Sequence, residues 1–413
     1  MTADTGTRGV CPRCRHPLVS EPRTLAWCPD CEWKLAAYDP LRMASDWGWR
    51  PLDRLLHRLA YRLDARSFRR LAGRPPGRSG NLAGRVLLLA VSVPFLLAAP
   101  ACLVLGGYLF VAGLGLAPVL GVLLVLFAVL IRPRAPRLPR RFRLVDPARA
   151  PAFVGLVEQV AAACAAPVPQ LIAVDASLNA ASMLVGVRRR RVLAIGLPLW
   201  AALPPGQRVA LLAHELGHFV NHDSRRGLLT GPAFTTLARL VDVLRSVARR
   251  GGYLFTLPYL VLGWLFWLGY VLLLVTGLRD GQRAEYLADD IAADVAGSAA
   301  AADLFDTLAV LEPVTRTVRD GGRDRASVAT WRDAARYVRR DLAERMEISR
   351  QRSIREEASL LASHPPAGLR SRMARSRPHR EPRVTLTDAL AGQIDAELAP
   401  WYRQLDEAGG GWL

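Results

Sequence analysis

The chain alternates between long apolar stretches and segments in which polar and apolar positions recur at helical or strand spacing. Residues 86–131 contain no charged side chain, and this length suits two membrane spans of about 20 residues each. Residues 251–278 form a second apolar stretch, and residues 226–248 before it are amphipathic. The pattern predicts a mainly α-helical integral membrane protein with about four transmembrane helices.

A segment with the pattern of a soluble region lies between these apolar stretches. Residues 151–166 repeat apolar positions at helical spacing, and "PQLIAVDAS" (169–177) and "RRVLAIG" (190–196) are short β-type runs. Pro205 then marks the start of a further helix. From residue 279 onward the chain is charged and helical in pattern. We therefore expect a small β-sheet surrounded by helices.

The charge distribution agrees with a membrane arrangement. The formal net charge is +19, and Lys34 is the only lysine among the 55 basic residues. Arginine-rich segments flank residues 86–131 on both sides, and such flanks mark the cytoplasmic side of membrane helices. This stretch is therefore expected to form a helical hairpin with both ends in the cytoplasm. The flanks account for the basic charge, and no aromatic–basic stacking surface indicates a nucleic-acid partner.

Four cysteines near the N-terminus form two C-x-x-C pairs separated by thirteen residues. Four thiolates can close a tetrahedral structural zinc site, so Cys11, Cys14, Cys28 and Cys31 predict a zinc ribbon. Such a ribbon either recruits a partner or only caps the fold. The first residues lack the pattern of a cleavable signal peptide, so the N-terminus is expected to stay in the cytoplasm.

The segment after the cysteines, residues 41–84, alternates apolar and basic positions at helical spacing. It predicts a basic amphipathic helix. Two interpretations are open: the helix lies on the inner membrane surface, or it is an ordinary solvated helix.

The stretch "LLAHELGHFVNHD" supplies candidate metal ligands. Residues four apart share one helix face, so His214 and His218 can reach one zinc ion, with Glu215 beside them to act on a bound water. His222 extends the same face but lies two turns from His214, about 12 Å along the axis, which is too far for one ion. A third ligand must therefore come from elsewhere.

The segment "GQRAEYLADDIAADVAG" offers that ligand. Glu285 would complete a His-His-Glu set, and Asp289, one turn later, can hydrogen-bond the free nitrogen of a zinc-bound histidine. Because His218 and Glu285 must meet at one ion, the chain between them crosses the membrane an even number of times. Residues 226–248 are then the partner crossing of residues 251–278, or the latter segment is re-entrant.

Three motifs occur together in a familiar order: "HELGHFVNHD", "AEYLADDIAAD" and "SHPPAGLRSRM". In this respect the chain resembles the HtpX-like and CAAX prenyl protease family of membrane-embedded zinc metallopeptidases, over roughly residues 85–375. The resemblance implies a zincin-like (gluzincin) domain in which His214, His218 and Glu285 bind zinc and Glu215 is the catalytic base. It also matches Asp223 and Asp289 to aspartates of the family's metal site.

The resemblance further implies a substrate-binding strand and two more residues near the active site. "LNAASM" resembles the family's edge strand, which places Asn179, Ala180, Ala181 and Ser182 beside the substrate backbone, although the usual aromatic residue is replaced. His364 and Arg370 fall in the family's H-P-P region; we expect His364 to help hold the oxyanion and Arg370 to contact substrate. The ribbon and the basic helix are additions to the core family.

The expected function is that of a membrane-embedded zinc-dependent endopeptidase, acting in membrane-protein quality control. Its expected cofactors are one catalytic zinc and a second, structural zinc in the ribbon. Its expected partners are peptide or membrane-protein substrates, membrane lipids and a protein bound by the ribbon. The expected location is the inner (cytoplasmic) membrane, multi-pass, with the active site on the cytoplasmic side. The alternatives are a ribbon-based interaction or sensor protein on a peptidase scaffold, and a CAAX-type processing protease.

The expected organisation follows from these segments. It is a zinc ribbon at 1–40, a basic amphipathic linker helix at 41–84, a transmembrane hairpin at 85–132, the first half of the zincin domain at 133–225, a second membrane helix pair at 226–279, and the second half with C-terminal helices at 280–413.

Overall fold

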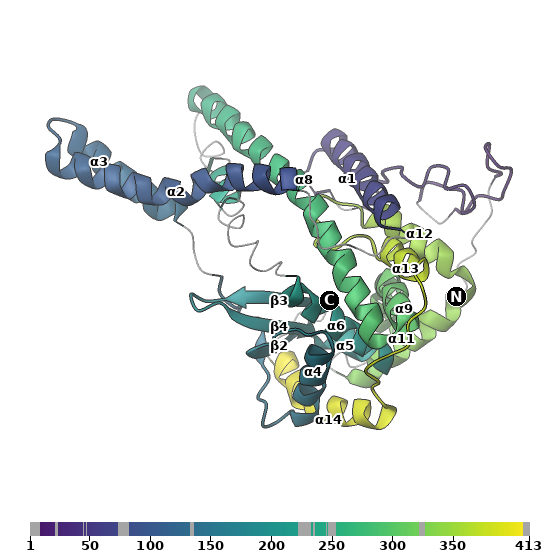
Figure 1. The fold of residues 1–413 in the computed structure, drawn as a ribbon. Coiled ribbons are helices and arrows are strands. Elements are labelled where there is room, and N and C mark those ends of the chain that lie inside the picture. The colour runs from purple at the N-terminus through teal and green to yellow at the C-terminus, as the bar shows by residue number, and fades with distance from the viewer. Residues whose placement is uncertain are drawn as a thin grey trace. The chain divides into compact units, whose positions relative to one another are not determined.

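A computed structural model describes residues 9–20, 24–43, 45–46, 48–72, 82–132, 136–221, 233, 236–244, 246, 253–321 and 327–407. The chain divides into two compact units, shown as a ribbon in Figure 1. The first unit comprises Met1–Gly77, Arg137–Asn221 and Gln282–Leu413, and the second comprises Arg78–Pro136 and His222–Gly281.

The first unit contains a four-stranded sheet in the order β1-β2-β4-β3. Its strands are β1 (Arg143–Leu144), β2 (Leu171–Asp175), β3 (Ala180–Val185) and β4 (Arg190–Gly196). The two β-type runs of the sequence form β2 and β4, which pair in parallel, whereas β1 and β3 pair antiparallel to their neighbours. This order leaves β3 at an edge of the sheet.

Helices pack against one face of the sheet and make up most of the first unit. They are α1 (Arg50–Leu71), α4 (Pro151–Ala163), α5 (Leu197–Ala202), α6 (Pro205–Val220), the C-terminal part of α8 (Tyr253–Ala296), α9 (Ser298–Ala309), α10 (Leu311–Asp320), α11 (Val328–Asp341), the short 3-10 helix η1 (Ala343–Arg345), α12 (Met346–Glu356), α13 (Ala367–Arg375) and α14 (Asp388–Glu407).

The main hydrophobic core lies on one face of the sheet. Alternate residues of β2 and β4, such as Val174 and Ile195, point into a cluster that also contains Phe153 of α4 and Leu212 of α6. Residues between them in sequence, such as Val192, face a smaller cluster on the opposite side of the sheet. Because successive side chains of a strand point to opposite faces, β2 and β4 contribute to both clusters, and α6 packs in the larger one.

Helix α6 packs very closely on α8 at a glycine inside the H-E-x-x-H motif. A Cβ atom added at Gly217 would lie 3.2 Å from the Cα and 3.3 Å from the Cβ of Ala288. Such distances are tighter than ordinary carbon contacts, so the absence of a side chain at Gly217 allows the two helices to approach. This contact brings the α6 histidines next to the part of α8 that carries Glu285.

The N-terminal residues of the first unit fold around the cysteines and continue into α1. Two isolated bridges, Val10–Pro17 and Val19–Trp27, are the β-pairings of the described ribbon residues. The apolar face of α1 is buried, with Leu56, Ala60 and Leu63 less than a tenth exposed. This face of α1 therefore packs on protein, and a position of the helix on the inner membrane surface stays a prediction.

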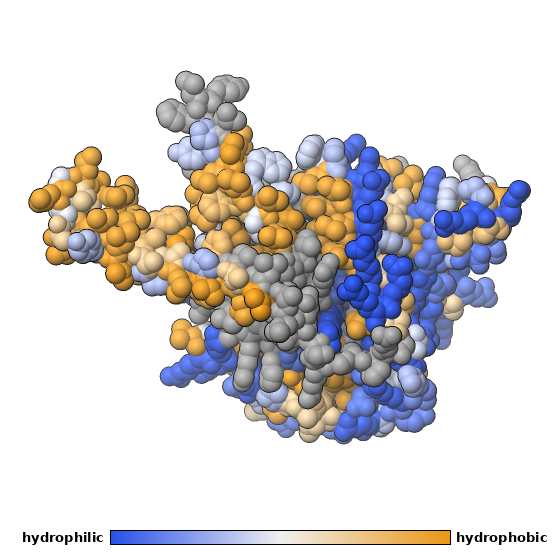
Figure 2. Space-filling model, turned by 45° about the horizontal axis from the view of Figure 1, so that its top comes forward, coloured by the Kyte–Doolittle hydropathy of each residue, from blue (hydrophilic) through white to orange (hydrophobic). Residues whose placement is uncertain are grey.

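The second unit contains an apolar helical hairpin, α2 (Leu82–Ala112) and α3 (Ala117–Ile131). The turn between them includes Gly115 at φ 64°, in the left-handed region that favours glycine. The helices touch at Gly106 and Gly121, where an added Cβ on Gly121 would lie 2.6 Å from the Gly106 carbonyl oxygen. Figure 2 shows the hydrophobic side chains that cover α2 and α3.

One helix among the described residues is long and apolar enough to cross a membrane by length and composition. It is Leu88–Ala112, 25 residues with a mean hydropathy of 2.4. The apolar helices Ala117–Ile131 and Pro258–Leu273 are shorter; the 15 residues of α3 rise about 22 Å, less than a hydrocarbon core of about 30 Å. Four transmembrane helices therefore stay a prediction.

Candidate metal centre

The two histidines of the H-E-x-x-H motif lie on one face of α6, as their spacing predicts. Their Nε2 atoms are 3.3 Å apart. His214 and Glu215 are both buried, at 2% and 3% exposure, and His218 is partly buried. Pro205 occupies the first turn of α6, where its missing N–H costs no helical hydrogen bond.

Glu285 of α8 completes a triangle of donor atoms with these histidines. Its Oε2 lies 3.5 Å from His214 Nε2, and its Oε1 lies 3.5 Å from His218 Nε2. Ligands at about 2.0–2.1 Å from a tetrahedral zinc ion are roughly 3.3 Å apart. Each histidine nitrogen thus meets a different oxygen of the Glu285 carboxylate, at separations that suit ligands of one zinc ion, and the His-His-Glu donor set suits zinc chemically.

His364 lies in the loop between α12 and α13 and reaches the same cluster. The ligating atoms of His214, His218, Glu285 and His364 all lie within 4.8 Å of one another. The Nδ1 of His364 is 2.5 Å from Glu285 Oε2, which is shorter than the separation of two ligands on one zinc ion. In this geometry His364 is a hydrogen-bond partner of the Glu285 carboxylate rather than a fourth ligand.

Asp289 and Arg370 support His214 from behind. His214 Nδ1 lies 2.9 Å from Asp289 Oδ1, so the carboxylate accepts the Nδ1 proton and leaves the Nε2 lone pair for a metal. Arg370 donates to both carboxylate oxygens of Asp289, at 2.6, 3.0 and 3.3 Å, and its guanidinium carbon lies 4.2 Å from the ring centre of Phe305. Arg370 was expected to contact substrate, but it is 4% exposed and its donors face Asp289 and His214.

The charges of the cluster set its protonation states. Burial alone would raise the pKa of Glu285, but the hydrogen bond from His364 and the neighbouring histidines lower this pKa to about 2. Burial likewise opposes ionisation of Asp289, yet Arg370 and His214 hold its pKa well below the usual range. Burial, with the charge of Arg370, lowers the pKa of His214. Anionic carboxylates and a neutral imidazole are the states that metal ligation requires.

The predicted substrate-binding residues 179–182 lie in and just before β3, which is an edge strand of the sheet formed by the described residues. Asn179 precedes β3, and its carbonyl accepts a 2.8 Å hydrogen bond from the Gly196 N–H. Because antiparallel pairing alternates along a strand, Ala181 then faces β4, while Ala180 and Ser182 turn their backbone N–H and C=O groups to the open edge. Asp223, predicted to support the metal site, lies outside the described residues, as does His222.

The four N-terminal cysteines form a second donor cluster. Their Sγ atoms all lie within 4.8 Å of one another, with Cys11 and Cys31 at 3.6 Å and Cys14 and Cys28 at 3.4 Å. Sulfur atoms bound to one zinc at about 2.3 Å are roughly 3.8 Å apart, so these separations fit a four-thiolate site. The backbone N–H of Arg13 also donates to Cys11 Sγ at 3.4 Å.

Comparison with known proteins gives one match. The family model described as Peptidase family M48 matches residues 147–377, which is 231 of the 413 residues. This range contains both histidines of α6, Glu285, Asp289, His364 and Arg370, but neither the four N-terminal cysteines nor α1–α3. No curated protein and no solved structure matches the chain.

Proposed function

Because the chain belongs to peptidase family M48, and is on that basis a metallopeptidase, we propose that it is a zinc-dependent endopeptidase. The observation that carries the proposal is the cluster of His214, His218 and Glu285: the two Nε2 atoms are 3.3 Å apart, and each lies 3.5 Å from one oxygen of the Glu285 carboxylate. Glu215 follows His214 directly on α6, so a general base stands beside the ligands. The HtpX-like branch of the family is the better candidate, because no prenyl-binding feature is evident in the sequence.

The chemistry divided among the side chains is metal-assisted hydrolysis of a peptide bond. A zinc ion held there would lower the pKa of its water and polarise the scissile carbonyl. Glu215 takes a proton from the attacking water and later delivers it to the leaving amine. His364, held by Glu285 through Nδ1, offers its other ring nitrogen to the oxygen on which negative charge develops. Asp289 and Arg370 keep the His214 ring in the orientation that ligation needs.

The proposed substrate is an extended peptide segment of a protein. The backbone groups of Ala180 and Ser182 at the open edge of β3 can pair with such a segment as an added strand. This pairing reads the main chain rather than particular side chains, which suits an enzyme with many substrates.

The remaining parts of the proposal concern the second metal and the membrane. We assign a structural zinc to the four cysteines on the strength of their sulfur separations. The exposed apolar surface of α2 and α3, with Val111 and Leu114 more than four-fifths exposed, supports insertion in the inner membrane. We place both the active site and the N-terminus on the cytoplasmic side. The cellular role that we propose is quality control of membrane proteins.

The decisive experiment compares the full-length protein with Glu215→Gln in casein cleavage and in metal content. Glutamine preserves the size of the side chain but cannot accept the proton, so we expect at least about a hundredfold loss of rate with an unchanged zinc content. Equal rates for the two proteins would refute the peptidase proposal. Two zinc ions without any cleavage would favour the sensor on a peptidase scaffold, and cleavage confined to prenylated C-terminal peptides would favour the CAAX-type protease.

A further inference from the structure

The ribbon and helix α1, residues 9–72, are here called the N-terminal module. This module lies against α12 and α13, the helices on either side of His364, and α13 also carries Arg370. We infer that the module positions the catalytic residues, so that metal binding at the four cysteines strengthens metal binding at His214, His218 and Glu285. The inference rests on the proposed function, because it assigns metals to both clusters.

The first link joins the second C-x-x-C loop to α12. The indole N–H of Trp27, next to Cys28, donates to Gln351 Oε1 at 2.9 Å. The amide of Gln351 in turn donates to the carbonyl of Pro29 at 2.6 Å, inside the same loop. Trp27 and Gln351 are each 1% exposed. One α12 side chain therefore holds the backbone of the loop that carries two of the four thiolates.

Arg355, one turn further along α12, holds both parts of the module. It donates to the Leu25 carbonyl at 2.7 Å and to Asp39 Oδ2 at 2.9 Å, while its own carbonyl lies 2.9 Å from His57 Nε2 of α1. Arg355 and Asp39 are each 2% exposed. Because a buried charge needs its partners, this side chain specifies one position for the ribbon relative to α12.

Helix α12 transmits this position to α13. The Gly368 N–H donates to Ser353 Oγ at 2.9 Å, and a Cβ atom on Gly368 would lie 2.1 Å from the Arg350 carbonyl oxygen, so the two backbones are in contact. Two residues later, Arg370 binds Asp289, which orients His214. A shift of α12 therefore reaches the metal ligand through one helix and one carboxylate.

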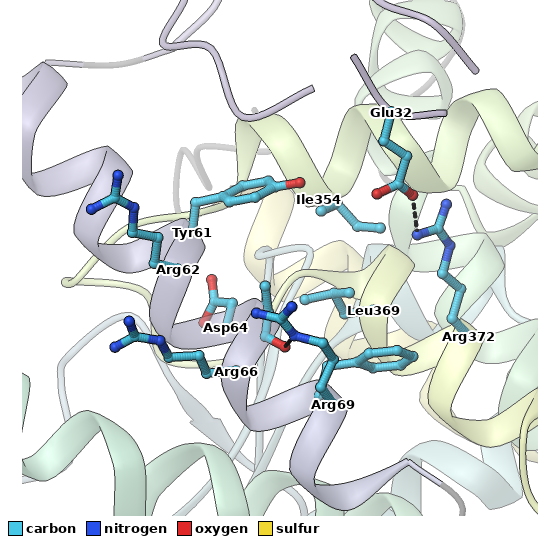
Figure 3. A pocket seen from close by; sticks show the side chains of 11 residues that line it. Glu32, Tyr61, Arg62, Asp64, Arg66, Arg69, Ile354, Leu369 and Arg372 are labelled. Carbon is cyan, nitrogen blue, oxygen red and sulfur yellow. Dashed lines mark hydrogen bonds and ion pairs between the residues drawn. The ribbon is translucent and has the colours of Figure 1, made fainter. Parts of the chain in front are cut away.

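Helix α1 also contacts the helix of the third ligand. The Gln282 amide donates to Asp64, and Gln282 precedes Glu285 by one turn of α8. Figure 3 shows Asp64 beside a cavity of about 540 Å³ that α1 lines together with Glu32, Ile354, Leu369 and Arg372. Beside this cavity, Val19, Trp27 and Leu35 of the ribbon pack with Ile354 and Leu369 in one buried apolar cluster, so apolar contacts and the bonded pairs at Asp64 and Arg355 both hold the module in place.

The ribbon itself depends on its metal for a defined shape. Its own buried cluster consists of Cys11, Leu18 and Cys28, and its described residues contain single bridges but no helix or strand. A segment with so little core takes its folding free energy from metal binding. Without the metal, Trp27 and Pro29 lose the positions at which Gln351 binds them, and Leu25 loses the position at which Arg355 binds its carbonyl. Coupling of this kind is reciprocal and amounts to about 5- to 150-fold in affinity.

The test uses the full-length protein loaded with Co²⁺, whose thiolate site gives sulfur-to-metal charge-transfer bands while a His-His-Glu site gives only d–d bands. The variants are Cys11→Ser/Cys14→Ser, which removes the ribbon metal, and the milder Trp27→Phe and Arg355→Lys, which keep the ring and the charge. Matched controls are Cys102→Ser, outside the four-cysteine cluster, and Arg316→Lys, in an exposed pair with Glu312.

In the three module variants, we expect chelator competition to show that metal affinity at the His-His-Glu site is about tenfold weaker than in the wild type. The d–d bands should be altered, and kcat should fall by more than any change in KM. Both controls should match the wild type. Glu285→Gln should weaken the ribbon site by the same factor. Catalytic-site affinity and d–d bands within twofold of wild type in all three module variants would overturn the inference. Coupled metal sites in a protein that cleaves nothing would instead overturn the proposed function alone.

Discussion

The buried ion pair between Asp289 and Arg370 allows stability and metal affinity to be separated by two substitutions. Asp289 is 3% exposed and Arg370 is 4% exposed, and three hydrogen bonds join them. Asp289→Ala removes the acceptor of the His214 Nδ1 proton and leaves the Arg370 charge buried without its carboxylate. The double variant Asp289→Ala/Arg370→Met removes that charge as well, and methionine can still pack against the Phe305 ring.

The two variants should differ by magnitudes that follow from this geometry. Removing one partner of a buried pair costs about 3–5 kcal/mol of unfolding free energy, whereas replacing both partners by packed apolar groups is close to neutral. Loss of the carboxylate behind a metal-bound histidine weakens metal affinity about 10- to 100-fold. We expect the single variant to show both losses, and the double variant to regain its stability but stay about tenfold weaker for zinc.

Denaturant unfolding of the metal-free proteins measures the first quantity, and competition with a zinc chelator measures the second. The wild type and Phe305→Leu, which keeps the ion pair but removes the ring, serve as references. Equal stability of the single and double variants would show that the Arg370 charge finds another partner when Asp289 is removed. Zinc affinity equal to wild type in both variants would show that Asp289 does not support His214.

Two further predictions concern the N-terminal module and the substrate strand. Burial raises the pKa of Asp64 to about 7 from its ordinary 3.8. Between these two values the folded state keeps a proton that the unfolded state loses. The free energy of unfolding therefore falls by up to about 4 kcal/mol as pH rises from about 4 to 7. Asp64→Asn should remove this loss, so urea unfolding at pH 8 should find the variant more stable than wild type; a variant with the wild-type pH dependence would contradict the assignment. Ser182→Pro removes an N–H from the edge of β3 that faces away from β4, without removing a bond to β4. We expect KM for a peptide to rise about tenfold in this variant with zinc content unchanged, whereas Ser182→Ala should behave as wild type. An unchanged KM in the proline variant would exclude strand pairing at this position.

Local periodicity is the part of the site that the sequence reveals. The four-residue spacing of His214 and His218 specifies a shared helix face before any tertiary structure is known. Glu285 could be proposed because a two-histidine helix leaves a zinc site incomplete, and its segment offers a glutamate with an aspartate one turn later. The two C-x-x-C pairs follow from the same reasoning, since tight turns bring paired thiolates together.

The contacts between distant segments are the part that the sequence hides. Arg370 meets Asp289 across 81 positions, and Trp27 meets Gln351 across 324. No helical or strand period links such residues, so their pairing depends on the packing of whole helices. Arg355 illustrates the same limit: an arginine in a basic chain looks like a solvated charge, yet it is 2% exposed and holds the ribbon.

Because the chain is synthesised from its N-terminus, the ribbon and the H-E-x-x-H helix are made before the helices that hold them. His218 leaves the ribosome 152 residues before Arg370, a delay of roughly 8 to 30 s at about 5–20 residues per second. During this interval the H-E-x-x-H helix lacks a complete α13, and for most of it the ribbon, although made earlier, has no α12 to bind. The histidines of α6 therefore gain the support of Arg370 only after this delay, so the order of synthesis places the completed metal centre well behind its first ligands.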